Sequence, residues 1–267
     1  MYVFNVVAIA ISLFDIWLLQ RISGSIQMGY YGLSYSIVAM CFMFTSAMTP
    51  IIMREFSKYL ELKDLETVRI LFKKYVPMLY SIAAYFGIFI AFHSEDLLLI
   101  FADERYLDAY FALVIMSFYP IHQTYGQLNA ALMFSAEKVI IYRNIGMFFA
   151  VLGLFMTFLM LYFYEKGAEG LALKMVVVQF LSVNVQLYYN SKYLNVRWLE
   201  YLYHQLISIS MFTFVAYITK FSIYEDRFAN FFFSGFIYSL ICLLLLLFFP
   251  KLFGLKSNSW LFKCVKK

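Results

Sequence analysis

Long, uninterrupted apolar runs constrain this chain more than any other feature. Residues 139–164 form one such run, and Arg143 and Asn144 interrupt it only near its beginning. A helix of about 20 apolar residues crosses the hydrocarbon core of a bilayer. Backbone groups in lipid must be paired within the segment, which favours helices over lone strands. The run therefore predicts a membrane-spanning helix.

The composition extends this prediction to the whole chain. Of the 267 residues, 64% are hydrophobic and 14% charged, and the mean hydropathy is +0.77. A soluble domain is about half apolar and about a quarter charged. We therefore predict an all-α integral membrane protein with about eight transmembrane helices. The expected spans are residues 3–20, 30–52, 75–92, 108–133, 139–164, 168–190, 204–222 and 230–250.

One sizeable polar segment, residues 54–74, interrupts the apolar pattern. Apolar side chains such as Phe56, Leu60 and Phe72 recur in it at helical spacing among basic residues. Basic amphipathic helices bind anionic headgroups, so we expect a cytoplasmic amphipathic helix along the membrane surface. A solvated linker with helical propensity is the alternative. A second short helix is expected to begin at Ser94, which Glu95 and Asp96 follow, and to dip into the outer interface.

The charged residues predict the orientation of the chain. Basic residues cluster in alternate gaps: segment 54–74, Lys138 with Arg143, Lys192 with Arg197, and the lysines of the C-terminal tail. The other gaps hold fewer basic residues and several acids. Because cytoplasmic loops carry the excess of Lys and Arg, both termini are predicted to be cytoplasmic. The net charge of +5 forms no single stripe, so nucleic acid is not an expected partner.

No known catalytic or nucleotide-binding motif occurs in the sequence. It contains no phosphate-binding glycine loop, no zinc-protease motif and no serine-nucleophile motif. His93, His122 and His204 share no metal-ligand spacing. The sequence therefore predicts no catalytic residue, no metal site and no cofactor, and the chain is not expected to be an enzyme.

Charged residues within the predicted spans are the first candidate site residues. Asp15 lies in the first span and Lys174 in the sixth. A charge at the bilayer centre costs about 2.5–3.5 kcal/mol on insertion scales, so each is a candidate for a substrate pathway. The alternatives are pairing of Asp15 with Arg21 and extension of the Lys174 amine to the outer headgroups.

Further candidates lie in the fourth span and at the cytoplasmic face. His122, Gln123 and Asn129 follow Pro120 in an unusually polar stretch, which is interpreted either as cavity lining or as helix-packing contacts. Arg54 and Arg143 are expected at the inner mouth of a cavity, where a guanidinium can bind a diphosphate with two hydrogen bonds. A role as helix-end anchors is the alternative.

Two segments resemble polysaccharide and O-antigen flippases of the multidrug/oligosaccharidyl-lipid/polysaccharide exporter superfamily. The first, residues 15–75, carries Asp15 in one span, Gly29-Tyr30-Tyr31-Gly32 opening the next, Pro50 at its end and a charged helical linker. The second combines residues 97–101 with Tyr106, Ala109 and residues 113–116. Together they cover about the first 145 residues. Family members usually have twelve to fourteen spans in two lobes, and this chain has room for one.

The resemblance implies a six-helix lobe in residues 1–203 followed by two accessory helices and a basic tail in residues 204–267. It implies flipping of undecaprenyl-diphosphate-linked oligosaccharide across the bacterial plasma (inner) membrane, for O-antigen or capsule synthesis, by alternating access around a polar, often cationic cavity. The expected partners are membrane lipids, the lipid-linked oligosaccharide, and a second lobe or another copy of the chain.

Two other functions are compatible with the sequence. A multidrug exporter of the same superfamily would need an apolar cavity lined by aromatic residues. A membrane-embedded polymerase or acyltransferase would need positioned acids and bases. A subunit that does not transport by itself is a third alternative.

Overall fold

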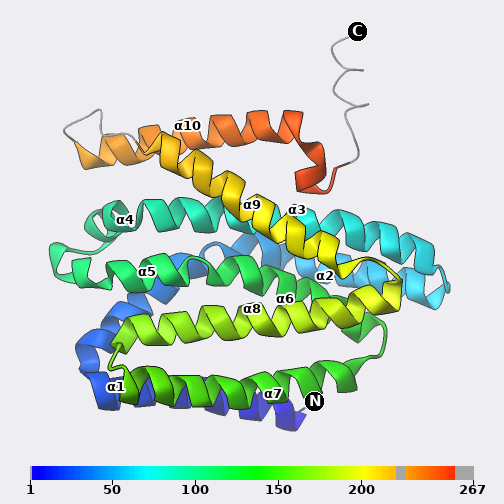
Figure 1. The fold of residues 1–267 in the computed structure, drawn as a ribbon, viewed down its shortest axis with the longest axis horizontal. Coiled ribbons are helices and arrows are strands. Elements are labelled where there is room, and N and C mark those ends of the chain that lie inside the picture. The colour runs from blue at the N-terminus through cyan, green and yellow to red at the C-terminus, as the bar shows by residue number, and fades with distance from the viewer. Residues whose placement is uncertain (1, 221–225, 256–267) are drawn as a thin grey trace.

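The structure, a computed structural model, describes residues 2–220 and 226–255, and every regular element in these ranges is helical (Figure 1). The long elements are α1 (Tyr2–Ala39), α2 (Phe42–Glu61), α3 (Leu65–Phe92), α6 (Tyr119–Ser135), α7 (Val139–Phe158), α8 (Gly167–Leu194), α9 (Trp198–Thr219) and α10 (Arg227–Phe248). The shorter ones are α4 (Ser94–Phe101), η1 (Glu104–Ala109), α5 (Tyr110–Met116), η2 (Leu159–Phe163) and η3 (Pro250–Phe253).

Six helices in the described ranges are long and apolar enough to cross a membrane. They are Val6–Ala39, Leu65–Phe92, Val139–Phe163, Gly167–Leu194, Trp198–Thr219 and Arg227–Phe248. The protein is therefore an all-α membrane protein. The remaining long apolar stretches are each divided: a turn at Met40 and Cys41 separates α1 from α2, and Ser117 and Phe118 separate α5 from α6.

The helices run back and forth, so their connections gather at two ends of the molecule (Figure 1). One end, at the right of the figure, holds the N-terminus and the α2–α3, α6–α7 and α8–α9 connections. We call it the basic end, because it carries Lys63, Lys138, Arg197 and Lys251. The opposite end holds α4 and the α7–α8 connection. We call it the acidic end, because Glu95, Asp96, Asp103, Glu104 and Glu165 lie there.

The first helix differs from the expected spans 3–20 and 30–52. Helical structure continues from Tyr2 to Ala39, with a kink at Gly24 (φ 87°, ψ 173°). The chain therefore changes direction at Gly24, which lies in the gap expected between these two spans, although helical structure continues on both sides of it. This backbone conformation is essentially restricted to glycine, which explains why the kink lies at one of the three glycines in this region.

The single surface helix expected over residues 54–74 does not form. The segment comprises the end of α2, a turn and the beginning of α3, and the turn residue Lys63 has φ 58°. Asp64 caps α3 through a hydrogen bond of 3.0 Å from the Thr67 amide. Phe56 and Phe72 are fully buried against other helices. Their helical spacing therefore reflects packing within the protein.

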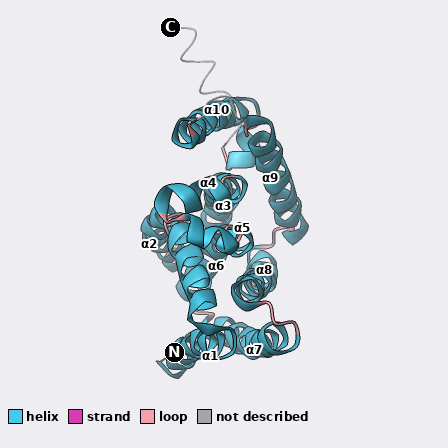
Figure 2. Ribbon diagram, turned by 90° about the vertical axis from the view of Figure 1, so that its left-hand side faces the viewer, coloured by secondary structure: helices cyan, strands magenta, loops and turns pink. Residues whose placement is uncertain are grey.

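Viewed along the helices, α9 and α10 lie at one edge of the bundle and α1 and α7 at the other (Figure 2). The main apolar core joins α2, α3, α6 and α8 to α9, α10 and η3. Hydrogen bonds fix α10 to α3: the Tyr238 hydroxyl donates to the Tyr85 carbonyl (3.0 Å), and the Tyr85 and Ser239 hydroxyl oxygens lie 2.6 Å apart.

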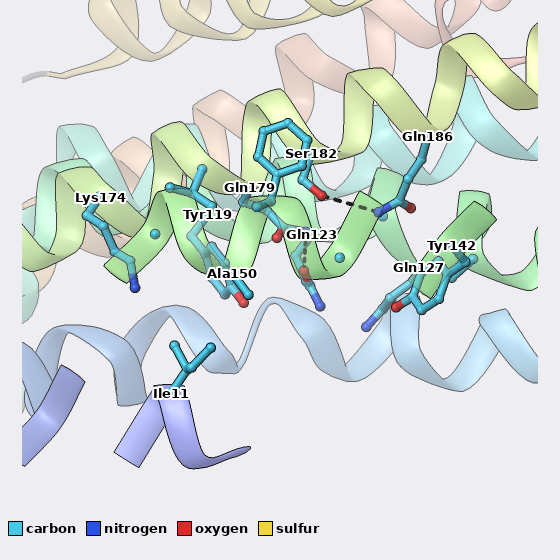
Figure 3. Close-up of a pocket in the computed structure, with 16 residues that line it drawn as sticks. Ile11, Tyr119, Gln123, Gln127, Tyr142, Ala150, Lys174, Gln179, Ser182 and Gln186 are labelled. Carbon is cyan, nitrogen blue, oxygen red and sulfur yellow. Dashed lines mark hydrogen bonds between the residues drawn. The ribbon is translucent and has the colours of Figure 1, made fainter. Parts of the chain in front are cut away.

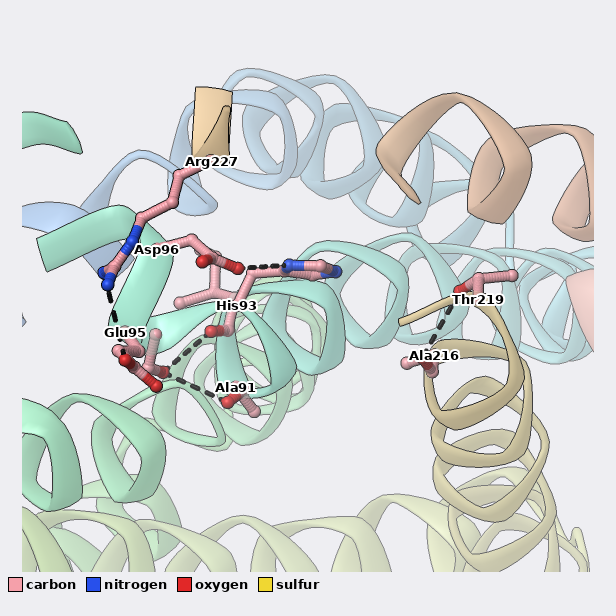
Figure 4. Close-up of polar contacts among 9 residues, drawn as sticks. Ala91, His93, Glu95, Asp96, Ala216, Thr219 and Arg227 are labelled. Atoms are coloured by element: carbon pink, nitrogen blue, oxygen red, sulfur yellow. Dashed lines mark hydrogen bonds and ion pairs between the residues drawn. The ribbon is translucent and has the colours of Figure 1, made fainter. Parts of the chain in front are cut away.

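At the acidic end, α4 begins at Ser94 as expected, with Glu95 and Asp96 in its first turn. Ser94 does not cap this helix, because its hydroxyl donates to the carbonyls of Ile90 and Ala91 (Figure 4). Asp96 instead contacts the His93 ring at 2.9 Å, and Glu95 lies 3.9 Å from Arg227 at the start of α10 (Figure 4). These contacts join α3, α4 and α10.

Candidate membrane cavity

A buried ion pair connects the two charged residues that lie within the spans. Lys174 of α8 forms a salt bridge with Asp15 of α1, and their side chains are 8% and 10% exposed. The Thr157 hydroxyl of α7 donates to the same Asp15 carboxylate at 2.7 Å. The ion pair and this hydrogen bond therefore connect α1, α7 and α8.

The structure shows neither of the two alternatives considered from the sequence, the pairing of Asp15 with Arg21 and the extension of Lys174 to the headgroups. Asp15 contacts Lys174 and Thr157, whereas the Arg21 guanidinium lies over the Trp17 ring at 5.6 Å. The Lys174 amine points inward to α1 and not along the membrane to headgroups. Mutual neutralisation and the Thr157 hydrogen bond lower the cost of burying both charges.

Lys174 also lines a cavity of about 400 Å³ between α1, α6, α7 and α8. Half of its lining residues are polar: besides Lys174 these are the uncharged residues Tyr119, Gln123, Gln127, Tyr142, Gln179, Ser182 and Gln186. Figure 3 shows Lys174 at one side of the cavity and Gln127 and Gln186 at the other. Lys174 is the only charged residue among the lining residues in the described ranges.

Hydrogen bonds orient several of the amides in this lining. The Gln179 amide donates to the Gln123 carbonyl oxygen, which joins α8 to α6. The Gln127 amide donates to the Ser46 hydroxyl of α2 at 3.3 Å. The Gln186 carbonyl oxygen is buried and has no hydrogen-bond partner among the described residues. The cavity is therefore lined by amide groups, which can both donate and accept hydrogen bonds.

Two glycines make room for these side chains. A Cβ on Gly153 of α7 would lie 3.1 Å from Lys174 Cε, and a Cβ on Gly126 of α6 would lie 2.8 Å from Gln179 Nε2. Both contacts are closer than ordinary van der Waals contact. Glycine at these positions thus lets Lys174 and Gln179 occupy the space between the helices.

The other candidates from the fourth span do not reach the cavity. His122 is 5% exposed and packs on the Phe180 ring, with centroids 4.9 Å apart. Asn129 is fully buried and accepts a hydrogen bond of 2.9 Å from the Asn190 side chain of α8. These two residues pack α6 against its neighbours.

Arg54 and Arg143 are exposed near the basic end and do not line the cavity. Arg143 follows the lining residue Tyr142, and its guanidinium donates to the Asn144 side chain at 3.1 Å. In the arrangement described here, no guanidinium lies where a diphosphate inside the cavity would bind.

Of the α8 residues that line the cavity, sequence reasoning identified Lys174 but not Gln179, Ser182 or Gln186 as lining residues. Gln179, Ser182 and Gln186 recur at intervals of three and four residues, which places them on one helix face. Gln123 and Gln127 show the same spacing on α6. Matching polar faces on two helices would have identified the site.

Comparisons with known proteins do not assign the chain to a family. No family model matches the sequence, and no curated protein matches it significantly. Within the described residues, no group of three or more His, Cys, Asp and Glu side chains is placed to hold a metal ion.

Proposed function

We propose that the protein moves an undecaprenyl-diphosphate-linked oligosaccharide across a bacterial plasma membrane. The amide-lined cavity is the observation that supports this most. Sugar hydroxyls both donate and accept hydrogen bonds, and their transfer into hydrocarbon without partners is costly. Gln123, Gln127, Gln179 and Gln186 supply donors and acceptors at membrane depth. A volume of about 400 Å³ lies within the usual range for small-ligand pockets, about 300–1,000 Å³.

The same lining favours sugar transport over multidrug export. A pocket for apolar drugs is lined mainly by hydrophobic and aromatic side chains. Tyr119, Tyr142 and Phe149 contribute rings here, but the lining also contains four glutamines. The buried ion pair gives the cavity no net charge, so we propose that neutral sugars and not the diphosphate occupy it.

The proposed topology has eight crossings, with both termini on the cytoplasmic side. The chain between Gly24 and the end of α2 would supply the second crossing, and η1, α5 and α6 together the fourth. Alternating access needs two bodies that move against each other around a site. We therefore propose that the chain works with a second lobe or another copy of itself.

Reconstitution in liposomes tests this function. Purified protein, alone and with a candidate second lobe, is incorporated with a fluorescent lipid-linked oligosaccharide, and its transfer between leaflets is followed by quenching from outside. Gln123→Leu, Gln179→Leu and Gln186→Leu should each reduce the rate about tenfold or more, because each removes buried hydrogen-bond partners of the sugar.

Gln27→Leu is the matched control, because Gln27 lies outside the cavity and is bonded to the Ala168 amide at the acidic end. It should leave transfer near the wild-type rate once protein amounts are equalised. Equal transfer by all three cavity variants and wild type would overturn the proposal. Uptake of an apolar cation by the same liposomes, with no transfer of the oligosaccharide, would favour multidrug export.

A further inference from the structure

A second recess lies at the basic end, far from the amide-lined cavity. Its volume is about 760 Å³, and α3 and the segment after α10 form its walls. Lys73, Lys74 and Lys251 line it together with the apolar side chains of Ile70, Leu71 and Leu255. We call it the lysine groove. No carboxylate is among its lining residues in the described ranges.

Close backbone packing builds this groove. Gly254 has φ +66°, and a Cβ there would lie 2.1 Å from the Lys74 carbonyl oxygen, so only glycine fits. The adjacent Leu252 carbonyl accepts hydrogen bonds from the Ser81 hydroxyl (2.8 Å) and the His204 ring (2.7 Å). The segment that carries Lys251 is therefore held beside Lys73 and Lys74, although Lys251 lies about 180 residues after them in the sequence.

The lysines of the groove have no acidic partner within the described chain. None of the ion pairs among the described residues includes Lys73, Lys74 or Lys251, and all three are exposed. Three like charges around one recess repel each other unless an anion lies between them. The apolar wall beside them favours an anion that also carries a hydrocarbon part.

We propose that the lysine groove binds an anionic phospholipid, with the headgroup phosphate among Lys73, Lys74 and Lys251 and an acyl chain along Ile70, Leu71 and Leu255. Basic pockets between transmembrane helices bind such headgroups. The groove lies in the first turns of α3, which is long and apolar enough to span a membrane, and the proposed topology places this end of α3 near the lipid phosphates. The site is separate from the proposed transport cavity and does not depend on it.

Native mass spectrometry of the full chain, with phosphatidylglycerol or phosphatidylcholine added in detergent, tests this site. Wild type should retain phosphatidylglycerol over phosphatidylcholine. The triple variant Lys73→Gln/Lys74→Gln/Lys251→Gln should bind phosphatidylglycerol about tenfold or more weakly, because each lysine near a lipid surface contributes to attraction. Lys251→Gln alone should weaken binding by a smaller factor, which keeps the test valid if the triple variant is unstable.

The matched control removes three other exposed lysines, two of them beside the nearby α2–α3 turn: Lys58→Gln/Lys63→Gln/Lys192→Gln. It has the same net charge as the groove variant and should bind phosphatidylglycerol within about twofold of wild type. Equal losses in the two triple variants would show diffuse attraction and overturn the site. Displacement of the lipid by millimolar inorganic phosphate would overturn the role of the apolar wall.

Discussion

At the scale of single residues, the charges inside the bundle impose the strictest requirements on the structure. Asp15 and Lys174 are stable there only because each neutralises the other and Thr157 supplies a further hydrogen bond. Removal of one partner leaves a buried, uncompensated charge, which costs more than removal of both.

Asp15→Asn and Lys174→Gln should therefore each lower the free energy of unfolding by about 3–5 kcal/mol. The double variant should lose clearly less than the sum, because no unpaired charge remains. Unfolding in detergent, followed by fluorescence, measures all three. Lys192→Gln, which removes an exposed lysine from the same helix, should have little effect. Additive losses in the double variant would show that the pair is not coupled.

Asp64 makes a pH-dependent contribution outside the membrane. Hydrogen bonds from the Thr67 hydroxyl and amide lower the pKa of its carboxyl below the usual value for an aspartate. A lowered pKa in the folded state means that this stabilisation is present above the unfolded pKa and is lost as the pH falls through the folded pKa. Asp64→Ala should therefore lower the melting temperature at pH 7 and have a diminishing effect below about pH 4.

Glu61→Ala is the control for this measurement, since Glu61 is exposed in the last turn of α2. It should change the melting temperature little at either pH. If the melting temperature of Asp64→Ala stays below that of wild type by the same amount down to pH 3, the carboxylate does not provide the cap.

The candidate site was partly predictable from single residues. Asp15, Gln123 and Lys174 were identifiable because polar groups in apolar runs are costly in lipid. Their interaction partners were not identifiable. Asp15 and Lys174 are 159 positions apart, and no local sequence pattern indicates that they form a pair. His122 is polar like its neighbour Gln123, but it lies on a different face of α6, where it packs against the Phe180 ring.

At the scale of secondary-structure elements, helix content was predictable and helix boundaries were not. The apolar runs correctly indicated α3, α7, α8, α9 and α10, because length and hydropathy suffice for continuous spans. The prediction of one surface helix over residues 54–74 was wrong for a physical reason. An apolar stripe that faces a lipid surface and one that faces a neighbouring helix have the same period, and only the tertiary structure distinguishes them.

The kink in α1 depends on one glycine. Gly24→Ala should destabilise the protein by about 1–3 kcal/mol, because alanine is strained at φ 87°, ψ 173°. No atom lies within 4 Å of the added Cβ, so the effect comes from the backbone alone. Gly29→Ala and Gly32→Ala have equally open surroundings and no positive φ. These controls should be neutral or slightly stabilising in the same thermal unfolding measurement.

At the scale of the whole molecule, the separation of charge between the two ends relates the fold to the membrane. Lys63, Lys138 and Arg197 lie in connections at one end, and Glu104 and Glu165 at the other. The proposed topology accounts for this pattern, because it places an even number of crossings between the N-terminus and each basic connection. The basic end would face the cytoplasm by the rule that Lys and Arg remain inside.

Cysteine labelling tests this arrangement in cells. With Cys41, Cys242 and Cys264 replaced by serine, a membrane-impermeant maleimide should label Glu104→Cys and Glu165→Cys in intact cells. It should label Lys63→Cys and Glu137→Cys only after permeabilisation, because these turns lie at the basic end. The opposite result at all four positions would keep the eight crossings and reverse the orientation. Labelling that differs between Lys63→Cys and Glu137→Cys would contradict the crossing count itself, because α3 to α6 must then traverse the membrane an odd number of times.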